Sequence, residues 1–414
     1  MAFSSSTSKN LIGLQIPPPS TPTLTDSGSE SDTVASTSSS TASPSWQNVD
    51  VVEPHTSYKK VLVTGGAGFI GSHVAEYLLN RGDDVVIIDE VNDYYDVTIK
   101  ESNLKNLRSK FPQSNRLKIY RGDICDEELM TNIFETDRPQ WVCHMAARAG
   151  VRPSIQDPYI YIHSNVHGTT RLMELSARYG VQNFVFASSS SVYGDSTSTY
   201  FSEEEVVDHP VSPYAATKKA CELLAYTYHH LYKLNVSALR FFTVYGPRGR
   251  PDMAPFKFID RVSRGAEIQQ FGDGSSSRDY TYIDDIVDGV VRSIDRPYAY
   301  QIFNVGKGNG TSLKEFIDLV QKHTGKVAKV KVMPDQPGDV PYTCADVSKA
   351  SYLLGYESKV SFEEGIRRTA EWYQDAYMGK KNEVKYCPEL QANSLGRAAS
   401  FTNLASLIDA TPSN

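Results

Sequence analysis

The sequence predicts an α/β protein built on a doubly wound parallel sheet, with a smaller α/β lobe in the C-terminal part of the chain. Three observations predict this fold class. An apolar run at residues 61–63 is followed by three glycines spaced three residues apart and then by helical apolar spacing. A second apolar run, at 85–88, ends in Asp89. Apolar runs then alternate with amphipathic stretches, which indicates right-handed crossovers and a sheet covered on both faces.

The glycine turn and the acidic residue predict a dinucleotide site of the Rossmann type. Gly65 allows a tight turn, Gly68 lets the backbone approach a pyrophosphate, and Gly71 lets the helix pack close to the sheet. An acid at Asp89 can bond the adenosine ribose hydroxyls and repels a 2′-phosphate, which favours NAD over NADP. A glycine-rich turn without a ligand is the alternative. The neighbouring residues expected to contact the cofactor are Phe69, Ile70 and Asn92.

The composition limits the class of protein. The chain has 414 residues, 40% hydrophobic and 22% charged, which suffices for a cofactor domain plus a smaller substrate domain. A net charge of -7 argues against a non-specific nucleic-acid binder. Five scattered cysteines form no CxxC pair and have no histidine at ligand spacing, which predicts a reduced intracellular protein without structural zinc or another metal. No apolar run is long enough for a bilayer and no signal peptide is evident, so we expect a cytoplasmic protein.

Composition also divides the chain into four regions. Residues 1–57 are rich in Ser, Thr and Pro and cannot bury enough apolar surface to offset their ordering entropy, so we expect a disordered tail. Residues 58–245 carry the strand–helix pattern of the NAD-binding domain, and residues 246–377 form mainly the substrate-binding lobe. Residues 378–414 are polar and irregular and are predicted to be a flexible tail. In that tail Ser400 lies three residues after a basic residue, which is either a phosphorylation site or a chance match.

Further strands are predicted at 117–120, 140–144, 183–187 and 238–242. The carboxyl ends of parallel strands meet at the edge where open α/β sheets bind ligands. Asp123 follows the third strand, where it could receive the adenine amino group beside Ile124; a role in capping the helix from Asp126 onward is equally compatible. Ala146 and Ala147 follow the fourth strand, and their small side chains permit close approach of a cofactor.

A serine cluster follows the fifth predicted strand. Ser189, Ser190 and Ser191 would stand at the ligand-binding edge, where hydroxyls can bond a sugar or a carboxylate; a plain polar loop is the alternative. About 25 residues downstream, Tyr214 and Lys218 are four residues apart and lie on one face of a helix predicted at 211–233. The ammonium favours the phenolate form of the tyrosine, and a serine hydroxyl bonded to the phenol would position it.

Residues from about 59 to 377 resemble the extended short-chain dehydrogenase/reductase family, and within it the nucleotide-sugar epimerases that act on UDP-glucuronate. Tyr214 and Lys218 match the family pattern, as do HMAA at 144–147, SSSSVYG at 188–194, LRFFTVYG at 239–246 and RDYTYIDD at 278–285. Three stretches resemble the glucuronate enzymes in particular: AGVRPS at 149–154, GRPDMAP at 249–255 and QPGDVP at 336–341.

The resemblance implies that Ser189, Tyr214 and Lys218 form the catalytic triad. Tyr214 would remove the proton from the sugar O4 while C4 gives its hydride to NAD. The transient 4-keto sugar would then turn over and take the hydride back on its other face. A homodimer is also implied, because family members often pair two long helices, here those predicted at 157–180 and 211–233.

The resemblance also implies contacts to a UDP-sugar. Arg250 and Arg278 would hold the diphosphate or nearby substrate groups, because two arginines suit phosphate recognition; ordinary surface charge is the alternative. Where Gln336 stands, 4-epimerases for neutral sugars usually carry an arginine, so we expect the phosphate contacts to differ here. The remaining residues implied are Arg152, Thr243 and Asp339 for the substrate and Phe241 for the cofactor.

Ser190 and Ser191 help to choose among related activities. A similar 4,6-dehydratase would carry an Asp-Glu pair after the catalytic hydroxyl residue, and a UDP-glucuronate decarboxylase would carry an acidic residue there. Oxidation of glucuronate at C4 creates a β-keto acid that loses carbon dioxide readily, so an epimerase must hold the carboxylate. Ser190, Ser191 and Thr243 are suited to this as neutral donors. We therefore predict interconversion of UDP-glucuronate and UDP-galacturonate. The alternatives are a UDP-glucose/UDP-galactose 4-epimerase, the decarboxylase and an NAD-binding scaffold without catalysis.

Overall fold

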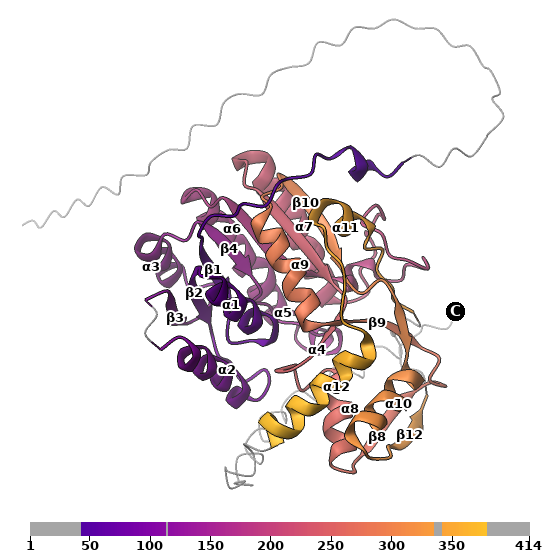
Figure 1. Cartoon of the computed structure of the whole chain (residues 1–414). Helices are drawn as coiled ribbons and strands as arrows, with labels where there is room; N and C mark the ends of the chain where they lie inside the picture. Colours follow the sequence, from indigo (N-terminus) through magenta and orange to yellow (C-terminus); the bar gives the residue numbers. More distant parts are fainter. Residues whose placement is uncertain (1–42, 113–114, 335–341, 379–414) are drawn as a thin grey trace, which may run out of the picture. The chain divides into compact units, whose positions relative to one another are not determined.

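The computed structural model describes residues 43–112, 115–334 and 342–378. A seven-stranded sheet with the order β10-β6-β5-β4-β1-β2-β3 forms its centre (Figure 1). Neighbouring strands in this sheet are parallel throughout, which confirms the predicted fold class. The strands are β1 (Lys60–Thr64), β2 (Asp84–Asp89), β3 (Leu117–Arg121), β4 (Trp141–His144), β5 (Asn183–Ser189), β6 (Val236–Phe241) and β10 (Tyr300–Val305).

Alternate residues of each strand enter two different cores. In β1, Val61 and Val63 belong to one cluster and Leu62 to the other, and all three are 0% exposed. Such two-sided burial explains why the strand sequences are continuous apolar runs. The first face is covered by α1 (Phe69–Arg81), α2 (Val97–Lys110) and α9 (Ile283–Asp295), and the second by α3 (Glu127–Asp137), α6 (Gly168–Arg178) and α7 (Pro213–Tyr232).

The strand order reverses direction between β1 and β4. On one side of β1 the chain continues through β2 to β3, and on the other side through β4 to β5 and β6. In an open parallel sheet the helices that follow the strands on either side of this point lie on opposite faces, which leaves a crevice at the carboxyl ends. Gly65 and Met145, the first residues after β1 and β4, therefore lie at the edge where a ligand is expected.

Two helical segments lie together on the second face. The predicted helix at 157–180 is a run of α5 (Pro158–Tyr161), the π-helical η2 (Ile162–His167) and α6, preceded by the short α4 (Val151–Gln156). The predicted helix at 211–233 is α7, which both α6 and η2 contact. Ser212 begins α7 because its side chain accepts a hydrogen bond from the N–H of Ala215, and Lys233 ends it in the left-handed conformation.

Much of the chain from Thr243 onward forms two smaller sheets, with the strand orders β11-β9-β7 and β12-β8. In Figure 1, β8, β12, α8 and α10 lie together on one side of the large sheet. The strands are β7 (Thr243–Tyr245), β8 (Glu267–Phe271), β9 (Ser277–Tyr282), β11 (Gly310–Ser312) and β12 (Lys329–Met333). The helices are α8 (Ala254–Ser263), α10 (Leu313–Thr324) and α12 (Phe362–Trp372), whereas α11 (Ser348–Leu354) packs against β10 and α9 of the large sheet. The 3-10 segments η1 (Ser45–Asn48) and η3 (Ser190–Tyr193) and the π-helical η4 (Tyr373–Met378) complete the described elements.

The described chain departs from the predicted regions in two places. Strand β10, beyond the boundary predicted at residue 245, pairs with β6 because this buries Phe303 and Val305. The division into two lobes therefore stays a prediction. The predicted disorder is wrong for residues 44–57, where Trp46 packs against Tyr352 and the N–H of Val52 donates to the Tyr298 hydroxyl at 3.1 Å.

Residues 1–42 and 379–414 of the two predicted tails, including Ser400, lie outside the described residues. Among the helices that the structure describes, none combines the length and the apolar character that crossing a bilayer requires.

Candidate active site

The glycine turn that joins β1 to α1 packs closely against neighbouring backbone atoms. Gly65 adopts a φ of +68°, and a side chain on it would come within 2.7 Å of the backbone nitrogen of Ala146. A Cβ on Gly71 would lie 2.2 Å from the carbonyl oxygen of Gly65. Both glycines are therefore required by backbone contacts, as the sequence predicted for a close turn and a close helix.

The same turn fits the pyrophosphate of a dinucleotide. Gly68 caps α1 in an extended conformation, and no side chain of the described chain bonds to the first amide groups of this helix. The first N–H groups of a helix have no partner within it and attract negative charge. At the end of β2, the Asp89 carboxylate accepts hydrogen bonds from the N–H groups of Ala67 at 2.9 Å and Val91 at 2.8 Å. Its oxygens keep lone pairs for ribose hydroxyls.

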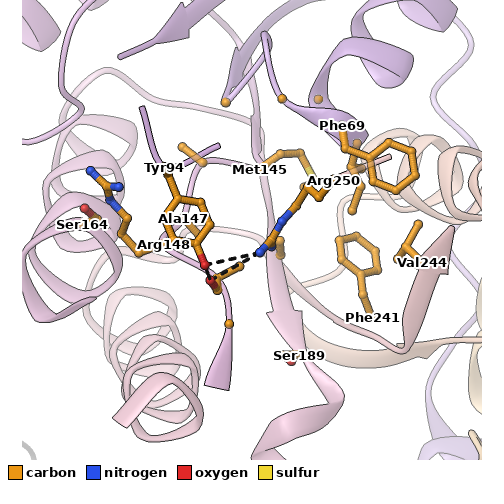
Figure 2. A pocket seen from close by; sticks show the side chains of 18 of the residues that line it. Phe69, Tyr94, Met145, Ala147, Arg148, Ser164, Ser189, Phe241, Val244 and Arg250 are labelled. Carbon is orange, nitrogen blue, oxygen red and sulfur yellow. Dashed lines mark hydrogen bonds between the residues drawn. The ribbon is translucent and has the colours of Figure 1, made fainter. Parts of the chain in front are cut away.

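One cavity at the carboxyl edge of the sheet includes the whole predicted cofactor set. Figure 2 shows part of its lining. The turn and the first residues of α1 form one wall, and the residues that follow β2, β3 and β4 form another. The predicted cofactor residues that line it are Gly65, Gly68, Phe69, Ile70, Gly71, Asp89, Asn92, Asp123, Ile124, Ala146, Ala147, Tyr214, Lys218 and Phe241.

Asp123 is part of this cavity, and Asp126 caps the following helix. The Asp126 carboxylate accepts the N–H of Leu129 at the start of α3. Asp123 instead accepts the N–H of Cys125 at 2.9 Å and lies 2.9 Å from Nε2 of His163. Burial alone would raise the pKa of Asp123, but the hydrogen bonds from Cys125 and His163 outweigh burial and lower it. The carboxylate is thus anionic at the end of the cavity.

Ser189, Tyr214 and Lys218 line the same cavity. Lys218 is 4% exposed, and its Nζ donates a hydrogen bond to the carbonyl oxygen of Ala187 at 2.7 Å, which ties α7 to β5. The Ser189 hydroxyl donates to Oγ of Ser191 at 3.1 Å. Within the described chain no bond joins Ser189 to Tyr214, so the predicted serine–phenol contact is not formed here.

His144 connects the ends of β1 and β4 to α6. Its two ring nitrogens lie 2.7 Å from the hydroxyl of Thr64 and 2.8 Å from that of Thr169, and the residue is 2% exposed. Burial, assisted by the charge of Lys218, lowers the pKa of His144 to about 3. The ring is therefore neutral at physiological pH and joins β1, β4 and α6.

Arg250 crosses the cavity toward Tyr94, as Figure 2 shows. Its guanidinium lies 3.5 Å from both the Tyr94 hydroxyl and the Ala149 carbonyl oxygen. Asp252 holds it with bonds of 3.0 and 2.5 Å. Burial would lower the pKa of Arg250, but Asp252 raises it above the ordinary value, so the side chain remains a cation.

A second cavity adjoins the first, and its lining is net positive, with four basic side chains and the two acids Asp252 and Asp273. The two cavities share Thr243 and Met253. Two of the basic side chains that line the second cavity, Arg152 and Arg278, were predicted from the sequence, whereas Lys257 and Arg261 were not. Arg250 lines only the first cavity, so the two arginines predicted for the diphosphate are in different cavities. Asp339 lies outside the described residues.

Other lining residues carried weak or no sequence signals. Lys257 and Arg261 are four residues apart on α8, a spacing that could have indicated a basic helix face. Lys100 lines the first cavity, where Nζ donates to the backbone oxygen of Asn92 at 2.8 Å. Tyr94 and Arg148 also line it, and only the folded chain brings the guanidinium groups of Arg148 and Arg250 to the Tyr94 ring.

A dinucleotide turn that shares a cavity with a Tyr-x-x-x-Lys pair on α7 defines the class of this protein, the short-chain dehydrogenases/reductases of the extended type. The family model described as GDP-mannose 4,6 dehydratase matches residues 62–369. The chain belongs to the UDP-glucuronate 4-epimerase family within this class, as its resemblance to that family predicted.

Proteins of known name align with about three quarters of this chain. A UDP-glucuronate 4-epimerase of Thermodesulfobacterium geofontis is 47% identical over 315 residues, 76% of this chain and 96% of that protein. A crystal structure of UDP-glucuronic acid 4-epimerase from Bacillus cereus, in complex with UDP-glucuronic acid and NAD, is 35% identical with a TM-score of 0.71 and covers 77% of this chain and 100% of its own. UDP-glucose 4-epimerase from Thermotoga maritima, solved with UDP-glucose, is 34% identical with a TM-score of 0.70, covering 77% and 99%.

Proposed function

We propose that this protein is an NAD-dependent 4-epimerase that interconverts UDP-glucuronate and UDP-galacturonate. The observation that carries the proposal is the junction of the two cavities at Thr243 and Met253. One cavity has the dinucleotide turn and Tyr214, and the other has four basic side chains suited to a diphosphate. A nucleotide sugar with its diphosphate in the basic cavity would place its sugar ring at the junction.

The chain's own residues would handle the proton at the sugar O4. Bound NAD would supply a reversible hydride acceptor for C4. Tyr214 would take the O4 proton during oxidation and return it during reduction, as a general base and then a general acid. Lys218 is one helical turn away, and its hydrogen bond to the carbonyl oxygen of Ala187 holds the ammonium in place. Ser189 would bond the sugar oxygen that Tyr214 deprotonates.

The charge distribution in the first cavity supports a uronate over a neutral sugar. The acidic side chains that line the described cavity are Asp89, Glu90 and Asp123, which follow β2 and β3. Ser190 and Ser191 follow β5, on the other side of β1, and Thr243 lies at the junction. A carboxylate beside these hydroxyls would meet neutral donors, and Asp252, which lines the second cavity, is paired with Arg250. Holding it there would resist the loss of carbon dioxide from the keto sugar.

The direct test is NMR spectroscopy of the purified full chain incubated separately with UDP-glucuronate and with UDP-glucose, without added reductant. We expect UDP-galacturonate from the first and no product from the second. If UDP-glucose yields UDP-galactose and UDP-glucuronate yields no product, the serines bind the hydroxyl groups of a neutral sugar and not a carboxylate. UDP-xylose or a pentose 4-keto sugar as the main product would show decarboxylation and overturn the proposal.

A matched pair of serine variants tests the carboxylate contact. Ser190→Asp places an acid where the substrate carboxylate would bind, so we expect a large rise in the KM for UDP-glucuronate. Ser198→Asp adds the same charge at an exposed position and should leave the KM unchanged. Equal KM values for both variants would show that Ser190 does not contact the substrate.

We also propose that the protein is a homodimer in the cytoplasm. Large apolar side chains are exposed on the two neighbouring helical segments: Tyr159 is 81% exposed and Ile162 50% on one, and Leu223 is 59% exposed and Tyr226 55% on the other. Neighbouring exposed apolar side chains support an interface with a second copy.

Analytical ultracentrifugation of Leu223→Asp tests the dimer, with Val327→Asp as the control at an 83% exposed position in the loop between α10 and β12. We expect only the first variant to sediment as a monomer. A fluorescent fusion of the full chain tests the location, and an organellar signal would contradict it.

A further inference from the structure

A cysteine and two histidines meet beside the end of the first cavity, although they are far apart in the sequence. Each of Cys125, His163 and His167 offers one ligand atom, and the three atoms lie within 4.8 Å of one another. Cys125 comes from the loop between β3 and α3, and both histidines come from η2. This cluster has no part in the reaction proposed above.

The local fold holds the three side chains toward one point. His163 and His167 are four residues apart on the π-helical turn, with ring centroids 5.7 Å apart and planes at 66°. The thiol of Cys125 lies against the same turn, donating to the carbonyl oxygen of His163 at 3.3 Å. Both histidines are exposed and Cys125 is half-buried, so an ion in solution can reach the cluster.

The chemistry of the three groups selects one class of ion. A thiolate and two imidazoles are the donors that zinc and similar transition metals prefer, whereas magnesium and calcium prefer oxygen. Ligand atoms around a zinc ion lie about 2.0–2.3 Å from it and therefore about 3–4 Å from one another. Small side-chain rotations bring atoms within 4.8 Å into that range. Three protein ligands leave a fourth position for water.

A neighbouring carboxylate strengthens the assignment. Oδ2 of Asp123 lies 2.9 Å from Nε2 of His163, and Asp123 is fixed in turn by the N–H of Cys125. Carboxylates that bond a histidine commonly orient that ring toward a metal or raise its basicity. Asp123 and Ser164 also line the first cavity, so the cluster stands at its rim.

We propose that Cys125, His163 and His167 form a binding site for a divalent transition metal ion of the zinc class. The site lies outside the proposed reaction machinery and does not depend on the proposed function. It differs from the sequence prediction of a chain without a metal site, because its ligands are 38 and 42 residues apart and meet only through the packing of η2 beside the β3–α3 loop.

The test is titration of the metal-free full chain with Co²⁺, followed by absorption spectroscopy. We expect one ion per chain, with a thiolate-to-cobalt charge-transfer band and the visible bands of a tetrahedral ion. Cys125→Ser should abolish the charge-transfer band. His167→Asn should raise the Kd for Co²⁺ by at least about tenfold. Even side chains that only orient a metal-binding residue contribute about 10- to 100-fold to metal affinity.

Matched controls separate this site from incidental binding. Cys387→Ser removes a thiol outside the described residues, and His209→Asn removes an exposed imidazole on another loop. Both controls should keep the band and the Kd of the unaltered chain, and circular dichroism checks that every variant is folded. The absence of a charge-transfer band, or a band that survives Cys125→Ser in a folded protein, would overturn the assignment.

Discussion

The hydroxyl of Ser188, the residue before the proposed catalytic Ser189, donates a hydrogen bond to the buried carboxylate of Glu222 at 2.7 Å. Glu222 is two helical turns after Tyr214 on α7, and Arg240 of β6 contacts both of its oxygens at 2.9 Å. Both side chains of this ion pair are 1% exposed. The Ser188 bond therefore ties β5, the strand that carries Ser189, to the helix that carries Tyr214, and the ion pair ties β6 to the same helix.

Loss of one member of this pair should destabilise the fold. Glu222→Gln removes the charge that compensates the buried Arg240, whose Nη1 already lacks a hydrogen-bond partner among the described residues. We expect the free energy of unfolding to fall by about 3–5 kcal/mol. Urea denaturation measures this. Glu222→Met combined with Arg240→Met should recover most of the loss, because it leaves no charge buried; a double variant as unstable as Glu222→Gln would contradict the explanation.

Gly71→Ala should impair both folding and cofactor binding. The added Cβ would lie 2.2 Å from the backbone oxygen of Gly65, so α1 must move away from the turn. We expect a loss of about 1–3 kcal/mol in unfolding free energy and a marked rise in the Kd for NAD. Calorimetry and NAD titration measure the two effects. Gly180→Ala, where nothing lies within 4 Å of a Cβ, should leave NAD binding unchanged despite its φ of +67°.

Tyr214→Phe should reduce turnover without unfolding the protein. The variant keeps the ring, which lies edge-on to Tyr161 with centroids 6.1 Å apart, and removes only the group that would transfer the proton. We expect turnover to fall about 10²–10⁴-fold with little change in the melting temperature. Tyr159→Phe, at a position 81% exposed, is the control. Normal turnover in Tyr214→Phe would exclude this tyrosine as the acid and base.

His144 should make stability depend on pH. Its folded pKa of about 3 is below that of the unfolded chain, so the unfolded state binds a proton that the folded state does not. The stabilising contribution is present above about pH 6.5 and is progressively lost as the pH falls toward 3. We measure the number of protons taken up on unfolding between about pH 5 and 7. At about pH 5 we expect the His144→Asn variant to take up about one proton fewer than the unaltered chain. An unchanged proton uptake would mean that His144 is charged in the folded state.

Much of the fold was predictable because local patterns agree with the tertiary environment. The apolar run at 61–63 predicted a strand buried on both faces, and Val61, Leu62 and Val63 enter both cores. The π-helical turn η2 was not predictable, because its period differs little from that of an α-helix over six residues. The disorder predicted for residues 44–57 was wrong, because Trp46 is buried by a helix some 300 residues away in the chain.

For the site, the sequence alone determined the residue types that local rules demand. Glycines at 65, 68 and 71, the acid after β2 and the Tyr214–Lys218 spacing follow from a turn, a strand end and a helix period, each contained within a few residues. Only the tertiary structure decided which distant side chains meet. Crossover connections bring strand ends and helices together in space, so they alone placed Arg250 against Tyr94, joined the basic cavity to the first at Thr243, and assembled Cys125 with His163 and His167.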